Sequence, residues 1–256
     1  MTTEVIILAQ GTQKRMGPGA CYKQLLPLPA CNGVPILVRT LIQLGVRRLS
    51  VTIVTWSPIM RAMDVPYAEI EPWRAILRAR PLPNVHHVEL ETPGNSSLKG
   101  ISRYLELRGT EHRFNTIVLL GDVVYSWKCL DALFALSATS GFVGSRDVSE
   151  STGELWGLAW AHNQEPRMLD DLRDAVLRHP PFEDEYQPGQ LRRWITGMRR
   201  GELALHVASL THKGRYIAID DYTMDVDVPS HIPKLGPASV AAAADDALHD
   251  LTWETP

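Results

Sequence analysis

The sequence predicts an α/β fold with a doubly wound, mostly parallel mixed sheet in an α/β/α sandwich. Short apolar runs typical of buried strands recur along the chain, and amphipathic helical patterns fall between them at the spacing of βαβ units. A length of 256 residues suffices for one large domain with an ample core. We therefore expect a single domain over residues 1–232, with halves at 1–125 and 126–232, followed by a tail at 233–256.

The first half contains four predicted strands, at Val5–Leu8, Val51–Thr55, Val85–Leu90 and Thr116–Leu120. A helix is predicted at Pro35–Leu44, because apolar residues recur on one face, a proline stands near its start and Gly45 follows its end. We expect this helix to support the fold and not the chemistry.

The second half is predicted to extend the sheet with strands of mixed direction and fewer helices. Apolar runs occur at Gly141–Gly144, Leu155–Trp160, Leu203–Leu210 and Tyr216–Ile219. Residues 165–201 are the most polar and irregular block. Two interpretations stay open for this block: a cover over a ligand site at the carboxyl edge of the sheet, or a packed surface excursion.

Composition excludes several classes of partner. The formal net charge is only −3, so no global field attracts nucleic acid or an anionic membrane. Three cysteines without C-x-x-C spacing indicate neither a disulfide framework nor a zinc site. The N-terminal apolar run is too short for a signal sequence or a membrane span, and a cytoplasmic location is expected.

The most informative stretch is residues 4–26, EVIILAQGTQKRMGPGACYKQLL. A predicted buried strand runs into a loop of small residues that carries Arg15 and ends at Lys23. Exposed backbone N–H groups and basic side chains suit a polyphosphate. The stretch lacks the G-K-[ST] ending of a P-loop and the G-x-G-x-x-G of a dinucleotide site. The simpler alternative is a strand followed by a basic surface loop.

LAQGTQKRMG followed by YKQLLPL resembles the signature of the nucleotidyltransferase superfamily, which includes sugar-phosphate nucleotidyltransferases, MobA-like enzymes and cytidylyltransferases. The resemblance implies catalytic roles for Arg15 and Lys23. It also implies nucleotide binding by the segment of five residues Leu8, Ala9, Gln10, Gly11 and Thr12. Gln10 and Gln13 stand where the family usually has Ala and Gly.

Acidic residues follow two predicted strands. In TIVLLGDVVYS, Asp122 comes after Gly121 at the carboxyl end of a strand, where ligands bind in such folds. A carboxylate there suits Mg²⁺. MDVDVPSHI is similar to the superfamily's second metal segment, and Asp225 and Asp227 both remain candidates for the ligand; His231 departs from the pattern. The alternatives are an ordinary turn at Gly121 and a solvated acidic turn later.

A third segment, ELETPGNSSLKGI, resembles the part of the superfamily that reads the nucleobase. Nucleotide binding is therefore implied for Gly94, Ser96 and Ser97. It is also expected of Gly121, beside Asp122. Capping of a helix at Leu98–Leu107 by one of the serines is an equally good interpretation, and it leaves the other serine for the base. The compact segment gives CTP a slight preference over UTP or dTTP.

Together these features predict an Mg²⁺-dependent nucleotidyltransferase that uses a nucleoside triphosphate and a phosphorylated small-molecule acceptor. Residues 1–125 would bind the nucleotide and 126–232 the acceptor. Two alternatives remain open: a glycosyltransferase that uses Asp225 and Asp227 as a D-x-D pair, and an inactive nucleotide-binding regulator. A homodimer is the candidate assembly. Acceptor identity is not encoded in any motif.

Overall fold

The computed structural model describes residues 3–9, 23–28, 34–45, 47, 49–56, 84–90, 104, 106–107, 114–145, 155–162, 216–221, 223–226 and 231. The predicted strand Leu203–Leu210, the polar block 165–201 and the tail 233–256 lie outside these residues.

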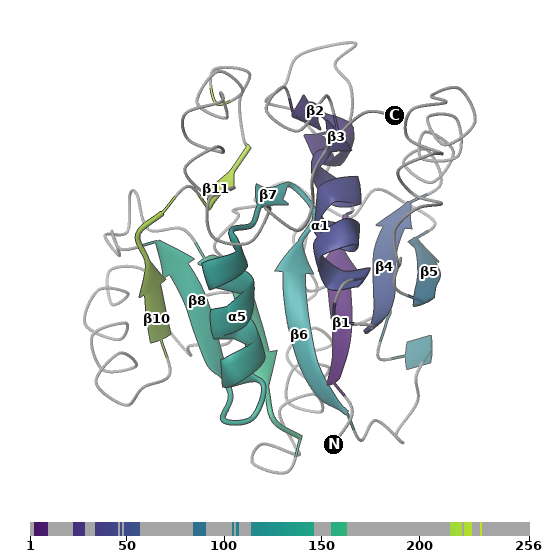
Figure 1. The fold of residues 1–256 in the computed structure, drawn as a ribbon. Helices are drawn as coiled ribbons and strands as arrows, with labels where there is room; N and C mark the ends of the chain where they lie inside the picture. Colours follow the sequence, from purple (N-terminus) through teal and green to yellow (C-terminus); the bar gives the residue numbers. More distant parts are fainter. Residues whose placement is uncertain are drawn as a thin grey trace, which may run out of the picture.

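A seven-stranded sheet in the order β10-β8-β9-β6-β1-β4-β5 forms the centre of the molecule (Figure 1). β9 pairs antiparallel with β6 and β8, whereas the other neighbours pair in parallel. The predicted mostly parallel mixed sheet is therefore confirmed. The strands are β1 (Thr3–Leu8), β4 (Ser50–Trp56), β5 (Asn84–Leu90), β6 (Asn115–Leu120), β8 (Gly141–Ser145), β9 (Leu155–Trp160) and β10 (Tyr216–Ile219).

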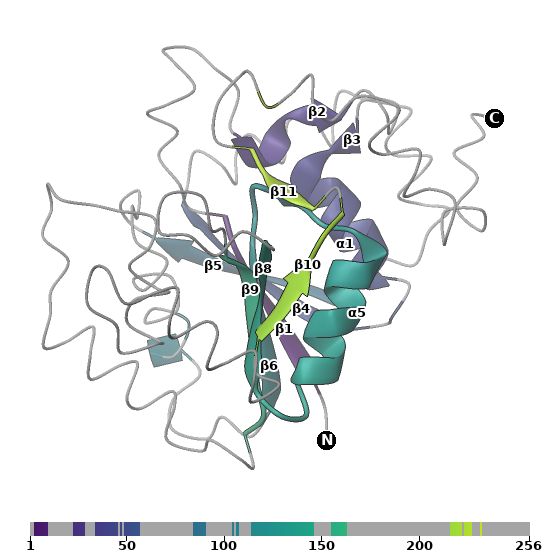
Figure 2. The same ribbon diagram turned by 90° about the vertical axis from the view of Figure 1, so that its left-hand side faces the viewer.

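Helices α1 (Ile36–Gly45) and α5 (Trp127–Leu136) cover the same face of this sheet (Figures 1 and 2). Val5 and Ile7 of β1 share a buried cluster with leucines of both helices. Side chains alternate along a strand, so Glu4 faces the other way. Tyr104, which is helical, donates a hydrogen bond to Glu4. Helical residues thus lie on both faces, as an α/β/α sandwich requires.

Four short strands and a one-turn helix lie beyond the carboxyl ends of β1 and β6 (Figure 1). β2 (Pro27–Leu28) pairs with β3 (Val34–Pro35), and β7 (Val123–Val124) pairs with β11 (Met224–Asp225). The one-turn helix η2 (Lys23–Leu25) packs against α1. This edge of the sheet is where the predicted site residues are expected to meet.

The predicted strands that fall in the described residues are confirmed, Leu155–Trp160 and Tyr216–Ile219 with the predicted boundaries and the others with boundaries shifted by one or two positions. The predicted helix begins one residue later than Pro35, because Pro35 pairs in β3 and the Ile36 N–H donates to the carbonyl of Leu26 at 3.2 Å. α5 was not expected. Among the described residues, none of the helices is both long and apolar enough to cross a membrane.

Candidate active site

The first carboxylate of the site follows the end of β6. Gly121 donates its N–H to the carbonyl of Leu8 at 2.9 Å, which ties the end of β6 to the end of β1. A Cβ at Gly121 would lie 2.9 Å from Cβ of Ala9. Glycine therefore allows the two chains to approach closely, and Asp122 emerges directly above the carboxyl edge of the sheet.

Lys23 of η2 pairs with this carboxylate across 99 positions of the chain. Its Nζ lies 2.8 Å from Oδ2 of Asp122. The side chains are only 9% and 20% exposed, so water screens the pair less than it would on an open surface. A cation from the N-terminal segment and an anion from the strand end are thus in direct contact.

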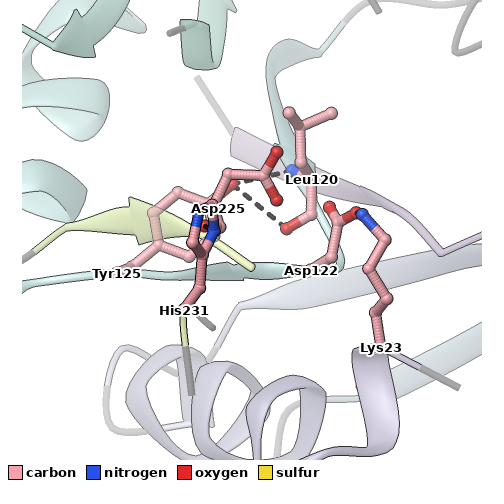
Figure 3. Close-up of polar contacts among 6 residues, drawn as sticks. All are labelled: Lys23, Leu120, Asp122, Tyr125, Asp225 and His231. Carbon is pink, nitrogen blue, oxygen red and sulfur yellow. Dashed lines mark hydrogen bonds and ion pairs between the residues drawn. The ribbon is translucent and has the colours of Figure 1, made fainter. Parts of the chain in front are cut away.

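Asp225 reaches the same place through the pairing of β11 with β7. It stands opposite Val123 in the antiparallel ladder, and the N–H of Val226 donates to the carbonyl of Asp122 at 3.1 Å. Figure 3 shows Asp122 between Lys23 and Asp225. Two aspartates about a hundred positions apart in sequence are therefore brought to the same edge of the sheet by this pairing.

A polar network at the start of α5 fixes the segment that carries Asp225. Ser126 caps the helix, since its Oγ accepts from the N–H of Cys129 at 2.9 Å and donates to Asp221 Oδ2 at 2.6 Å. Thr223 Oγ1 accepts from the N–H of Ser126 at 3.1 Å. Asp221 Oδ1 in turn accepts from the N–H of Thr223 at 2.7 Å. The approach of residues 221–225 to the site is therefore set by specific hydrogen bonds.

His231 contacts the backbone of the segment that carries Asp225. Its Nδ1 lies 3.1 Å from the carbonyl of Asp225. Because a carbonyl oxygen only accepts hydrogen bonds, this contact requires the proton on Nδ1. His231 departs from the superfamily pattern in sequence, and in the structure it contacts the backbone of the second carboxylate residue.

Tyr125 lies buried beneath the two carboxylates and joins the strands that carry the site. Its hydroxyl accepts from the N–H of Leu120 at 2.7 Å (Figure 3). The same hydroxyl lies 2.6 Å from the carbonyl of Trp156, to which it donates. Burial raises the pKa of Tyr125 well above its usual value, and the charges of Asp122 and Asp225 raise it further. The phenol therefore stays protonated and holds the end of β6 against β9.

The backbone carbonyl of Tyr125 accepts hydrogen bonds from two side chains of α1. Arg39 donates from Nη1 to the Tyr125 carbonyl at 2.6 Å, and Gln43 donates to the same oxygen at 3.3 Å. Arg39 also donates to Oε1 of Gln43 at 3.0 Å. Both side chains are buried. The expectation that this helix serves the fold is consistent with these contacts, which position the segment following Asp122.

The donor set of this cluster fits Mg²⁺, which takes oxygen ligands and is commonly held by one or two carboxylates plus substrate phosphates. Asp122 and Asp225 supply carboxylate oxygens, and Lys23 supplies a hydrogen-bond donor for a phosphate. Within the described part of the chain there is no group of three or more His, Cys, Asp and Glu side chains that would hold a metal ion without substrate.

Six of the predicted site residues lie together in the structure: Leu8, Ala9, Lys23, Gly121, Asp122 and Asp225. The other predicted site residues fall outside the described residues; these are Gln10, Gly11, Thr12, Arg15, Gly94, Ser96, Ser97 and Asp227.

Sequence reasoning missed the residues that hold the two carboxylates in place. Tyr125, Ser126 and Asp221 carry no motif that marks them. One signal was present: Arg39 and Gln43 stand four positions apart in a mostly apolar helical run, so they share one face. A polar pair on a helix that is buried all round indicates an internal polar contact.

Solved structures similar to this chain share its fold over nearly its whole length. The CTP:phosphocholine cytidylyltransferase LicC of Streptococcus pneumoniae matches with a TM-score of 0.57 at 13% identity, over 92% of this chain and 98% of that one. A protein of Bacillus anthracis assigned as a glucose-1-phosphate thymidylyltransferase matches at 0.54 and 12%, over 93% and 94%. HddC of Yersinia pseudotuberculosis matches at 0.50 and 14%, over 91% and 97%.

No protein-family model and no curated protein sequence matches the chain. At 12–14% identity the structural matches establish architecture and leave activity untested. The chain has the α/β fold of these cytidylyl- and thymidylyltransferases.

Proposed function

We propose that the protein is an Mg²⁺-dependent nucleotidyltransferase. A phosphate oxygen of a small-molecule acceptor attacks the α-phosphorus of a nucleoside triphosphate, the bond from the α-phosphorus to its bridging oxygen breaks, and pyrophosphate leaves. The observation that carries this proposal is the convergence of Lys23, Asp122 and Asp225 at the carboxyl edge of a nucleotidyltransferase-like sheet. No protein nucleophile is required, since the acceptor is already anionic.

The basic residues are assigned to the triphosphate. Lys23, already at the site, would donate hydrogen bonds to phosphate oxygens, and Arg15 with the backbone N–H groups of residues 8–12 would surround the β- and γ-phosphates. Lys23→Ala and Arg15→Ala are each expected to lower turnover about 10²-fold or more, because each removes a charge directed at developing phosphate negativity. Wild-type rates in both variants would contradict the assignment.

The carboxylates are assigned to the metal. Asp122 and Asp225 would hold Mg²⁺, with Asp227 as the alternative second ligand. When bound, the ion would neutralise charge on the reacting phosphates. Asp225 is favoured because its segment pairs directly with the one that follows Asp122.

Pyrophosphate release tests the proposal. The full chain is incubated with Mg²⁺, each of the four nucleoside triphosphates and a panel of phosphorylated alcohols, sugar phosphates and phosphonates. Asp122→Asn should abolish release. Asp131→Asn should not, because that carboxylate lies on α5 with its side chain 61% exposed. Neither a glycosyltransferase nor an inactive regulator would release pyrophosphate, so its absence with every pair would contradict the proposal.

A preference for CTP over UTP or dTTP is proposed from the small residues Gly94, Ser96 and Ser97. A serine that contacts the base should affect selection more than rate, because an unpaired polar group costs about 1–3 kcal/mol. We expect Ser96→Ala or Ser97→Ala to reduce discrimination among the four triphosphates. Unchanged discrimination with a lower melting temperature would indicate helix capping alone.

A further inference from the structure

Lys23 and the proposed metal have the same partner in this protein. Nζ of Lys23 lies 2.8 Å from Oδ2 of Asp122, and Asp122 is also the carboxylate assigned to Mg²⁺. The inference below therefore rests on the proposed function. It concerns the state of the site before any nucleotide arrives.

A monovalent and a divalent cation at one carboxylate repel each other. The Lys23 and Asp122 side chains are only 9% and 20% exposed, so water weakens this repulsion less than it would at the surface. Lys23, Asp122 and Asp225 together carry a formal charge of −1, which is a weak attraction for a dication. With Lys23 on Asp122, half of the carboxylate charge is already neutralised.

We propose that Lys23 is a counter-cation that keeps divalent metal off Asp122 until a nucleotide binds. The phosphates of an incoming nucleotide offer Lys23 a second anionic partner. When Lys23 moves onto them, Asp122 is left with both oxygens available. Nucleotide and metal then bind with positive cooperativity, because each favours the arrangement in which Lys23 has left Asp122.

The test measures binding of Mg²⁺ alone to the full chain by isothermal titration calorimetry, with no nucleotide present. Lys23→Met removes the competing charge and keeps an unbranched side chain of similar length. We expect Lys23→Met to bind Mg²⁺ at least about tenfold more tightly than the wild type. Adding Asp122→Asn to Lys23→Met should remove the gain, because it removes the carboxylate that the substitution releases.

Lys128→Met is the matched control. Lys128 is exposed on α5, so this variant changes the net charge by the same unit away from the site. Its Mg²⁺ affinity should equal that of the wild type. If Lys23→Met does not fold, as judged by circular dichroism, Lys23→Gln replaces it with the same expected gain.

The inference is overturned if Lys23→Met binds Mg²⁺ no more tightly than the wild type. It is also overturned if the gain in affinity persists when Asp122→Asn is added, or if Lys128→Met shows the same gain. Pyrophosphate release by the wild type is scored separately. Release without the gain in affinity rejects the counter-cation role and keeps the proposed function. Absence of pyrophosphate release by the wild type with every substrate pair rejects the proposed function itself.

Discussion

Tyr125→Phe tests whether the buried phenol holds the site together. The substitution keeps the ring and removes only the hydroxyl, which accepts from the N–H of Leu120 at 2.7 Å and donates to the carbonyl of Trp156 at 2.6 Å. Both backbone groups belong to strands of the central sheet. Phenylalanine fills the same space, so no large cavity accompanies the loss.

The magnitude follows from the two backbone groups that lose their partner. A buried donor or acceptor without a hydrogen bond costs about 1–3 kcal/mol. Loss of the hydroxyl from both backbone groups should therefore lower the free energy of unfolding by at least about 2 kcal/mol. For a chain of this size, that corresponds to a fall in Tm of about 4–8 °C.

Differential scanning calorimetry of the wild type and the variant measures this fall. Tyr216→Phe is the matched control, because it removes one hydroxyl that donates a hydrogen bond to one backbone group, the Ser145 carbonyl, at 2.9 Å. Its effect should be about half as large or less. A fall in Tm for Tyr125→Phe that does not exceed that of Tyr216→Phe would refute the reasoning.

Four further substitutions test other contacts. Asp122→Asn and Asp225→Asn should each abolish Mg²⁺-dependent pyrophosphate release with the circular dichroism spectrum intact; a wild-type rate in either removes that residue from the site. Gly121→Ala should cost about 1–3 kcal/mol by urea denaturation, because its Cβ would lie 2.9 Å from that of Ala9, and Ala9→Gly in the same chain should restore part of the loss. Burial raises the pKa of the Cys129 thiol, with the charge of Asp221 as a second cause. The unfolded thiol loses its proton near pH 8.5 while the folded one keeps it, so unfolding free energy should fall above that pH by up to about 1.4 kcal/mol per pH unit. Cys129→Ala should lack this pH dependence. The prediction is contradicted if the unfolding free energies of the variant and the wild type differ by the same amount at every pH between 7 and 9.5.

The central strands could be predicted because each satisfies a simple physical demand. A parallel strand covered on both faces needs a continuous apolar run, and β1 and β6 have one. The position of Asp122 followed from the same reasoning, since a ligand edge lies at the carboxyl ends of such strands. Lys23 was predicted from a resemblance to a family, because no periodic pattern marks it.

The pairing of β7 with β11 could not be predicted from the sequence. Each strand has only two residues, and a hydrophobic period cannot be recognised over so short a stretch. The choice between Asp225 and Asp227 therefore stayed open. Tyr125 was missed for a related reason: a hydroxyl that bonds to backbone groups of two strands is specified by the folded arrangement and by no local pattern.

The contact between Lys23 and Asp122 has a consequence for the order of events in folding. The two residues are 99 positions apart, and Asp225 lies as far again along the chain. Contacts between distant segments form slowly, because the entropy of closing the intervening loops must be overcome first. β1 and β6 close a loop of similar length when they pair. During refolding, the central sheet and the contact between Lys23 and Asp122 should therefore form together, so recovery of metal binding would report completion of the sheet.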